Sequence, residues 1–568
     1  MRAGMQVERR IKVVDFHDDE TTEYAISSHR WIDDTETNYE EIVGLANMES
    51  VERDAIRERV GYKKILDTCR QAQKDGYEWV WVDTCCIDKR SSAELSEALN
   101  SMYRWYRNAK TCYAYLHDVD GSSFPTEKDD KRYPKSNGWP EWFSRGWTLQ
   151  EMIAPSDVRF FNKNWQHIGN KKTLLWTLTG ITGVPPGILT GGLDANRPCV
   201  AQIMSWASNR MTTRVEDRAY SLMGLLDVNM PMLYGEGKKA FHRLQLEIIR
   251  SSNDQSIFAW GHTSNVRIGS ILADDPSFFG DCSDIMLLDR DKFILQSKGY
   301  FPGVGSMDAD QFGVFPVTNR GIQISMLLCP YRETKTVFRA YLPCRKEAYG
   351  PLVAIILVLW NSNYYRYPNV QEADLDDSPE FRQVYLRYQE TPNYTVTFDI
   401  DDTGLTENGF TCSNEGPDEH SGKNFMLTNA NPFHLRTYSE ERGNSLIKVA
   451  FGQCFGLDWV HVNNFPLDTF PSIYFEAPIS RGADLALSMA DLVPYHKLYG
   501  RLWIRDFHLP ESPWVVRTYR IMWERSNIVI RMEVFHDPHL QIGPDEWKVY
   551  DAEVGDFLVH MDYQHDHS

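Results

Sequence analysis

The chain has 568 residues, 42% of them hydrophobic and 24% charged, which is typical of a folded globular protein rather than a disordered one. Its 79 acidic side chains outnumber its 60 basic ones, so the formal net charge is −19. A negative charge of this size disfavours broad nucleic-acid binding and attachment to anionic membranes.

We expect no membrane span, secretory signal or disulfide framework. The longest apolar run, Leu352–Trp360, is far shorter than the roughly 20 residues that a transmembrane helix needs. The first residues are charged and lack the apolar core of a signal peptide, and no two cysteines are spaced as CxxC. We therefore expect an intracellular, cytoplasmic protein with reduced thiols.

Residues 1–170 alternate between expected strands and helices. The apolar run Tyr77–Asp83 is typical of a strand buried on both faces. The other expected strands are Ile11–Phe16, Glu23–Ser28, Thr111–Leu116 and Asp157–Phe161, the first two of them paired as a hairpin. Helices between strands imply parallel pairing, so we expect a doubly wound α/β domain.

Two further regions follow this domain. Residues 171–260 have helical periodicity, with a capping box predicted at Thr213 and Glu216; a similar box at Ser91 and Glu94 opens a helix of the first domain. Residues 261–568 have a period of two and are expected to form a β-rich sandwich or barrel. Its clearest runs are Gly321–Leu328, Thr336–Leu342, Tyr394–Ile400 and Ile528–Val534.

Polar residues follow three expected strands of the first domain. Ser28, His29, Arg30 and Trp31 end one strand, a segment with Asp83, Cys85 and Asp88 ends the next, and His117-Asp118 ends the third. In a doubly wound sheet such ends converge on one edge, where ligands bind. The alternative, that strand-end loops are simply polar, is equally consistent with these residues.

A short helix around residues 147–154 adds one carboxylate. Trp147 and Glu151 are four positions apart, so they share a helical face. The neighbouring residues are strongly apolar, which makes Glu151 either a partly desolvated functional acid or a surface residue that aids solubility.

Other motifs are weak. Gly235-Glu236-Gly237 resembles part of a dinucleotide fingerprint, but no expected strand precedes it, and a loop before a helix is the better interpretation. No P-loop and no nucleophile elbow occur. The side chains of the adjacent Cys85 and Cys86 diverge, so they cannot easily bind one tetrahedral metal ion. From these weak or missing motifs we expect neither a metal nor a bound cofactor.

Three blocks of the first domain resemble the fungal heterokaryon-incompatibility (HET) domain. They are Tyr24–Trp31 (YAISSHRW), Trp81–Val119 (beginning WVDTCCIDKR) and Trp142–Pro155 (WFSRGWTLQEMIAP). Residues 205–241 resemble the segment that commonly follows this domain. The resemblance implies a role in fungal non-self recognition and regulated cell death.

The family is also remotely similar to TIR domains, which are flavodoxin-like. Some TIR domains cleave NAD with a glutamate in a W-x-x-x-E arrangement, which corresponds to Trp147 and Glu151 here, although Thr148 stands where TIR domains usually have Cys. NAD+ is then the substrate and not a cofactor. Nicotinamide leaves NAD+ as a neutral molecule, so one carboxylate that stabilises the ribosyl cation is sufficient. In this hypothesis Trp31 or Trp147 faces the nicotinamide ring and Arg30 holds a phosphate.

The resulting hypothesis is an NAD+ glycohydrolase with Glu151 as the catalytic residue. The substrate would be bound by Ser28, His29, Arg30, Trp31, Asp83, Cys85, Asp88 and Trp147. The alternative is a non-enzymatic module that self-associates through the α/β domain and signals through an unknown protein partner. A weaker idea is carbohydrate binding by Trp459, Trp503, Trp514 and Trp523, for which core packing is the simpler explanation.

Overall fold

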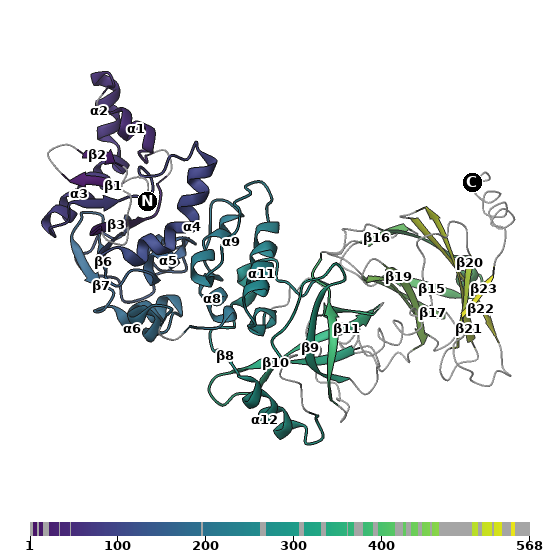
Figure 1. Ribbon diagram of the computed structural model, residues 1–568. Helices are drawn as coiled ribbons and strands as arrows, with labels where there is room; N and C mark the ends of the chain where they lie inside the picture. Colours follow the sequence, from purple (N-terminus) through teal and green to yellow (C-terminus); the bar gives the residue numbers. More distant parts are fainter. Residues whose placement is uncertain are drawn as a thin grey trace.

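The computed structural model combines helices and strands (Figure 1). The residues that it describes are 4–7, 11–14, 22–32, 35–45, 47–194, 197–261, 269–305, 312–330, 337–360, 362–367, 379–389, 396–414, 424–427, 433–440, 446–454, 457–464, 502–508, 514–524, 527–536 and 547–550.

The first part of the chain is built on a seven-stranded sheet with the order β2-β1-β4-β3-β5-β6-β7. The strands are β1 (Gly4–Val7), β2 (Ile11–Val14), β3 (Tyr24–His29), β4 (Trp79–Trp81), β5 (Thr111–Tyr115), β6 (Val158–Phe161) and β7 (His167–Asn170). The central strands β4, β3, β5 and β6 are parallel, whereas β1, β2 and β7 pair antiparallel with their neighbours. The sheet is therefore mostly parallel, as the alternating strands and helices predicted.

The expected hairpin between Ile11–Phe16 and Glu23–Ser28 is wrong. Strand β2 pairs with β1, and β1 pairs with β4. Strand β3 is central, and its two edges are occupied by the parallel strands β4 and β5. No edge of β3 is left for a hairpin partner.

Helices cover both faces of the sheet. Successive side chains of β3 point to opposite faces, so neighbouring residues of this strand contact different helices. Tyr24 points toward α4 (Ser92–Asn108), where its hydroxyl donates to the Trp105 carbonyl at 2.6 Å. His29 points toward α3 (Val60–Lys74), which carries the buried Lys64. The short helices α1 (Tyr39–Gly44), α2 (Ser50–Glu58) and α5 (Thr148–Ile153) and the 3₁₀ turn η1 (Glu141–Ser144) complete this region.

A helical segment follows and shares one buried core with the α/β sheet. This core also reaches the next β strands, as it runs from Tyr24 to Leu386. The helices are α6 (Leu175–Thr182), α7 (Pro186–Gly191), α8 (Val200–Ala207), α9 (Asp217–Tyr220), α10 (Met223–Leu226) and α11 (Lys239–Ser251), with the turns η2 (Gln255–Phe258) and η3 (Pro276–Phe279).

The two predicted capping boxes have different outcomes. The Ser91 side chain caps α4 by accepting from the Glu94 backbone amide at 3.3 Å. The box at Thr213 and Glu216 does not form, because Glu216 Oε1 instead accepts from the amides of Gly235 and Gly237 at 2.8 and 3.0 Å. Both glycines have positive φ, and they form the loop before α11 rather than a nucleotide fingerprint.

The β-rich region contains both architectures that the sequence left open. Strands β8 to β13 form a six-stranded sheet in which β11 also pairs with β10, so that the sheet closes into a barrel. A six-stranded sheet and a four-stranded sheet then share one apolar core, with Phe398 and Met532 on one and Tyr438 and Phe451 on the other. These two sheets pack as a sandwich.

The elements of this region are β8 (Ile285–Leu287), α12 (Arg290–Tyr300), β9 (Ile322–Pro330), β10 (Val337–Lys346), β11 (Leu352–Trp360), β12 (Asn363–Tyr367), β13 (Glu380–Leu386), β14 (Val396–Asp402), α13 (Thr403–Thr406), β15 (Phe410–Asn414), β16 (Asn424–Leu427), β17 (Phe433–Glu440), β18 (Leu446–Cys454), β19 (Leu457–Asn464), β20 (Leu502–His508), β21 (Trp514–Glu524), β22 (Asn527–His536) and β23 (Trp547–Tyr550). The side chains of Trp459, Trp503, Trp514 and Trp523, which suggested carbohydrate binding, lie outside the part that the structure describes.

Within the described ranges, no helix combines the length and the apolar character needed to cross a lipid bilayer. The same residues contain no cluster of three or more His, Cys, Asp or Glu side chains arranged to hold a metal ion.

Candidate functional site

Glu151 lies inside the protein, against the central strand β3. Its carboxyl accepts a hydrogen bond of 2.5 Å from the Ser28 hydroxyl, and the Ser28 oxygen in turn accepts from Trp142 Nε1 at 2.8 Å. Helix α5, which carries Glu151, packs on β3 and α4 and is buried along its whole length. Glu151 is 5% exposed. The predicted catalytic residue is therefore not a surface residue that aids solubility.

Burial controls the protonation of this carboxyl. Desolvation, and then the negative charge of Asp83, raise the pKa of Glu151 to about 8, while the Ser28 hydrogen bond and the charge of Arg145 oppose the shift. The nearby Tyr106 hydroxyl, which donates to the Ser27 carbonyl at 2.8 Å, also opposes it. About one carboxyl in ten is consequently ionised at pH 7.

His29 and Asp83 form a second buried group, on the opposite face of β3. His29 Nε2 is 3.5 Å from Asp83 Oδ1, and among the described residues neither atom has a hydrogen-bond partner. Desolvation, and then the positive charge of Lys64, hold the pKa of His29 well below its usual value. The Lys64 ammonium forms an ion pair with the Glu36 carboxylate, with hydrogen bonds of 2.5 and 2.6 Å. His29 is thus a neutral imidazole with an unused nitrogen.

Trp31 lies two residues beyond the end of β3 and is partly buried. Its indole Nε1 donates to Asp83 Oδ2 at 2.6 Å. Its ring has two cations over it, the Lys89 ammonium 3.5 Å and the Arg145 guanidinium carbon 5.1 Å from the ring centroid. These cations would repel the positively charged nicotinamide ring that the sequence analysis placed on Trp31 or Trp147.

The other predicted binding residues are engaged elsewhere. Arg30 forms an ion pair with Glu141, which also lies 3.7 Å from His117. Asp88 is bound by Arg90 through two hydrogen bonds of 2.8 and 2.9 Å. Cys85 is fully buried, and its hydrogen bond with Cys86 and desolvation raise its pKa well above the usual range. Cys85 is therefore not a reactive thiolate.

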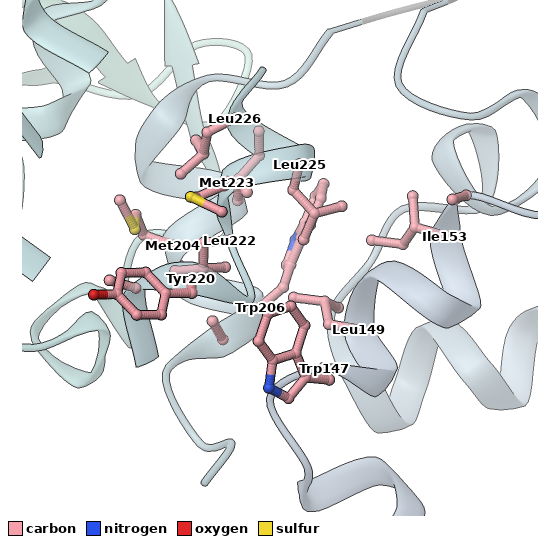
Figure 2. Close-up of a cluster of buried hydrophobic side chains, with 14 of the residues drawn as sticks. Trp147, Leu149, Ile153, Met204, Trp206, Tyr220, Leu222, Met223, Leu225 and Leu226 are labelled. Carbon is pink, nitrogen blue, oxygen red and sulfur yellow. The ribbon is translucent and has the colours of Figure 1, made fainter. Parts of the chain in front are cut away.

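Trp147 packs against the helical segment rather than beside the Glu151 carboxyl. The backbone relation of one helical turn is present, since the Glu151 amide donates to the Trp147 carbonyl at 3.4 Å. The Trp147 indole, however, lies beside the Asp217 carboxyl of α9. It belongs to the buried cluster that Figure 2 shows, whose labelled members are Trp147, Leu149, Ile153, Met204, Trp206, Tyr220, Leu222, Met223, Leu225 and Leu226. Trp147 therefore anchors α5.

A second contact fixes the same segment. The amide of Gly146 donates to the Met211 carbonyl at 2.8 Å, and the Met211 amide donates to the Ser144 carbonyl at 2.6 Å. The buried Arg210 guanidinium donates to the Arg145 carbonyl at 2.8 Å. The helical segment thus sets the position of both Arg145 and Glu151.

A cavity of about 620 Å³ lies at another edge of the sheet, near β6, β7 and α3. It is lined by Gln71, Asp157, Arg159, Phe161, Trp165, His167, Asn170 and Lys172. None of the predicted site residues lines this cavity.

Sequence reasoning missed the side chains that surround Glu151 and Trp31. Neither Trp142 nor Tyr106 was named as a candidate site residue, yet the Trp142 indole donates to Ser28 Oγ and the Tyr106 hydroxyl donates to the Ser27 carbonyl at 2.8 Å. Lys89 and Arg145 lie inside two of the HET-like blocks but were not singled out as site residues. One signal was present: both are basic residues immediately next to a predicted strand-end or helix-start segment, in a chain of net charge −19.

Two family models match the chain. Residues 24–139 match the heterokaryon incompatibility protein (HET) family, and residues 239–270 match a domain of unknown function, DUF8212. Two solved structures of the Xerocomus chrysenteron lectin XCL, wild type and a triple mutant, are each 14% identical, with TM-scores of 0.19 and 0.18. The matches cover 25% and 26% of this chain and 99% and 100% of the respective lectin chains.

A curated relative extends the first of these similarities. The chain is 44% identical over 231 residues to the vegetative incompatibility protein HET-E-1 of Podospora anserina. The aligned part is 40% of this chain and spans 16% of the relative's length. It is longer than the residues matched by the HET family model, so the similarity extends beyond them. Residues 24–139 of the chain are therefore similar to the heterokaryon incompatibility (HET) family.

Proposed function

We propose that this protein is a cytoplasmic effector of fungal non-self recognition, whose HET domain causes regulated cell death by cleaving the N-glycosidic bond of NAD+. The family match over residues 24–139 and the name of the vegetative incompatibility relative support the biological role. The chemical step is supported by the arrangement around Glu151.

The strand order supports a flavodoxin-like and TIR-like domain. In chain order the parallel strands are β3, β4, β5 and β6, and in the sheet they lie as β4-β3-β5-β6. This is the second-first-third-fourth order with which flavodoxin-like sheets begin. In such sheets the ligand binds beyond the carboxyl ends of the strands at the switch point, here between β3 and β5.

The single observation that carries the proposal is the hydrogen bond between Glu151 and Ser28. Ser28 is the penultimate residue of β3, so the bond holds the carboxyl close to the carboxyl end of the strand at the switch point. Nicotinamide departs from NAD+ as a neutral molecule and needs no proton. The ionised carboxylate is the form that stabilises the ribosyl cation, and a desolvated site increases this stabilisation.

The test is nicotinamide release from NAD+ by the purified full chain, with and without forced clustering. Wild type is expected to release nicotinamide and Glu151→Gln is expected to lose at least 99% of the rate. Glu247→Gln is the matched control, because Glu247 is on α11 and pairs with Arg250 at 2.5 Å. Absence of turnover by wild type under both conditions, or full turnover by Glu151→Gln, contradicts the proposal.

One observation favours a second candidate, a non-enzymatic module that self-associates through the α/β domain and signals through a protein partner. Glu151 is 5% exposed and its carboxyl accepts a hydrogen bond from the Ser28 hydroxyl, as a purely structural acid would. Expression of Glu151→Gln in the fungal host separates the two. Cell death that persists in a stably folded Glu151→Gln variant supports the module, and its loss supports catalysis.

A further inference from the structure

Lys89 and Arg145 form a small basic cluster with Trp31 at the edge of the sheet. Trp31 follows β3, Lys89 follows β4 and Arg145 precedes α5, so the fold assembles the cluster from three distant segments. The Lys89 ammonium is 3.5 Å and the Arg145 guanidinium carbon 5.1 Å from the centroid of the Trp31 ring. Lys89 is exposed and Arg145 is partly buried.

These two cations differ from the other basic groups of this edge. Arg30 is paired with Glu141, Arg90 with Asp88 and Lys64 with Glu36. Among the described residues, no carboxylate lies within ion-pair distance of the Lys89 ammonium or the Arg145 guanidinium. Their positive charge is therefore not cancelled by a direct partner.

The nearby acids offset the charge of the cluster only in part. Asp83, whose Oδ2 accepts from Trp31 Nε1 at 2.6 Å, supplies one carboxylate against the two cations. Glu151 is mostly protonated at neutral pH, since burial raises its pKa to about 8. A local excess of positive charge thus exists on a chain whose formal net charge is −19.

The chemistry of the cluster selects an anion. A guanidinium offers a planar fork of donors that matches phosphate oxygens, and an ammonium adds a compact point charge. The indole orients both cations, while the two charges disfavour a cationic ring at the same place. Residues 145–151 also join the cluster directly to Glu151, the carboxyl of the proposed reaction.

We propose that Lys89 and Arg145, held over Trp31, bind the pyrophosphate of a dinucleotide. The identity of the dinucleotide as NAD+ rests on the proposed function; the recognition of phosphate does not. Lys89 and Arg145 are positioning residues that bring the substrate ribose toward Glu151.

The test is calorimetric binding of ADP-ribose, which has the pyrophosphate but no nicotinamide to release, and of adenosine, which has no phosphate. Lys89→Gln and Arg145→Gln are each expected to weaken ADP-ribose binding at least tenfold and to leave adenosine binding unchanged. Added salt should weaken binding to wild type more than to Lys89→Gln. Thermal unfolding verifies that each variant is folded.

The matched controls are Lys110→Gln and Arg70→Gln. Lys110 directly precedes β5, at the opposite edge of the sheet, where it pairs with Glu23; Arg70 is on α3 and pairs with Asp67. Both controls should bind ADP-ribose as wild type does. Wild-type affinity in folded Lys89→Gln and Arg145→Gln, or equal affinity of wild type for ADP-ribose and adenosine, overturns the proposal.

Kinetics separate this proposal from the proposed function. A raised KM for NAD+ with unchanged kcat in Lys89→Gln supports both. If wild type cleaves no NAD+ but loses ADP-ribose binding on Lys89→Gln substitution, the glycohydrolase assignment fails and the phosphate site stands. If NAD+ is cleaved with an unchanged KM in Lys89→Gln, the phosphate site fails and the glycohydrolase stands.

Discussion

The Ser28 hydroxyl donates a 2.5 Å hydrogen bond to the Glu151 carboxyl and so joins β3 to α5 across 123 positions of the chain. The next residue of β3, His29, points to the opposite face and lies near Asp83, Glu36 and Lys64. The polar residues of this sheet edge are therefore divided between two faces. Asp83 and Trp31 lie at the edge where the two groups approach each other.

The first prediction concerns the pH dependence of stability. The folded pKa of Glu151 is about 8 and its ordinary value is 4.5, so between these values the native state holds a proton that the unfolded state has lost. Stability therefore falls as pH rises through this interval and levels off above pH 8. Glu151→Gln lacks the ionisable group, and the unfolding free energy of wild type relative to Glu151→Gln should fall by about 5 kcal/mol across it.

Urea unfolding at several pH values between 4.5 and 9 measures this difference. The shared titrations of all other groups cancel when wild type and variant are compared at the same pH. A difference that stays constant over this range contradicts a raised pKa at Glu151.

The second prediction concerns the pH profile of NAD+ cleavage. In the proposed reaction the ionised form of Glu151 is the active one, so kcat/KM should rise tenfold per pH unit below about pH 8 and become constant above it. The Ser28 hydrogen bond lowers the pKa of Glu151. Ser28→Ala should therefore move the midpoint to higher pH, and it should destabilise the protein by about 1–3 kcal/mol.

Ser144→Ala is the control for this substitution, since the Ser144 hydroxyl bonds only to the Glu141 carbonyl among the described residues. Its profile should match that of wild type. An unshifted midpoint in Ser28→Ala would show that the serine does not act on the carboxyl.

The third prediction concerns acid sensitivity through His29. Its folded pKa is depressed well below 6.5, first by burial and then by Lys64; Arg145 and Lys89 act in the same direction, and Glu36 opposes them. Below pH 6.5 the His29 imidazole is protonated in the unfolded chain but not in the native state, so stability falls as pH falls. Relative to His29→Gln, wild type should therefore lose stability as the pH falls from 6.5 to 5.

Chemical unfolding at these pH values measures the loss, and His167→Gln, at an exposed position of β7, is the reference variant. Equal acid sensitivity of wild type and His29→Gln would mean that the imidazole is charged in the folded protein.

The fourth prediction concerns the contact between the helical segment and the α/β domain. A Cβ at Gly224 of α10 would lie 2.2 Å from Tyr103 Cβ on α4, so the two helices must separate in Gly224→Ala. The expected cost is about 3 kcal/mol or more. Gly180→Ala is the matched control: no atom lies within 4 Å of its added Cβ, and alanine should stabilise α6 by about 0.5–1 kcal/mol.

Thermal unfolding of both variants measures these effects. The interpretation of α10 as packed directly on α4 fails if Gly224→Ala is as stable as wild type. Reduced NAD+ turnover in a folded Gly224→Ala protein would connect this contact to the position of α5.

The sequence by itself determined the local elements and the lineage. Thr111–Leu116 and Asp157–Phe161 were expected as strands and are β5 (Thr111–Tyr115) and β6 (Val158–Phe161). Such predictions succeed because the periodicity of hydrophobic residues, and the polar residues that end a strand, are local signals that span only a few positions of the chain. The motifs around Trp31, Trp81 and Trp142 were likewise sufficient to indicate the HET family.

Only the tertiary structure decided what those elements contact. Three features depend on residues that are neighbours only in space. Strand β2 pairs with β1, the Gly235 amide donates to Glu216, and Ser28 and His29 point to opposite faces of the sheet. The raised pKa of Glu151 has the same origin, because burial comes from helices and strands far away in sequence. Long-range packing determines dielectric environment and partner distance, and neither is encoded in the local pattern of residues.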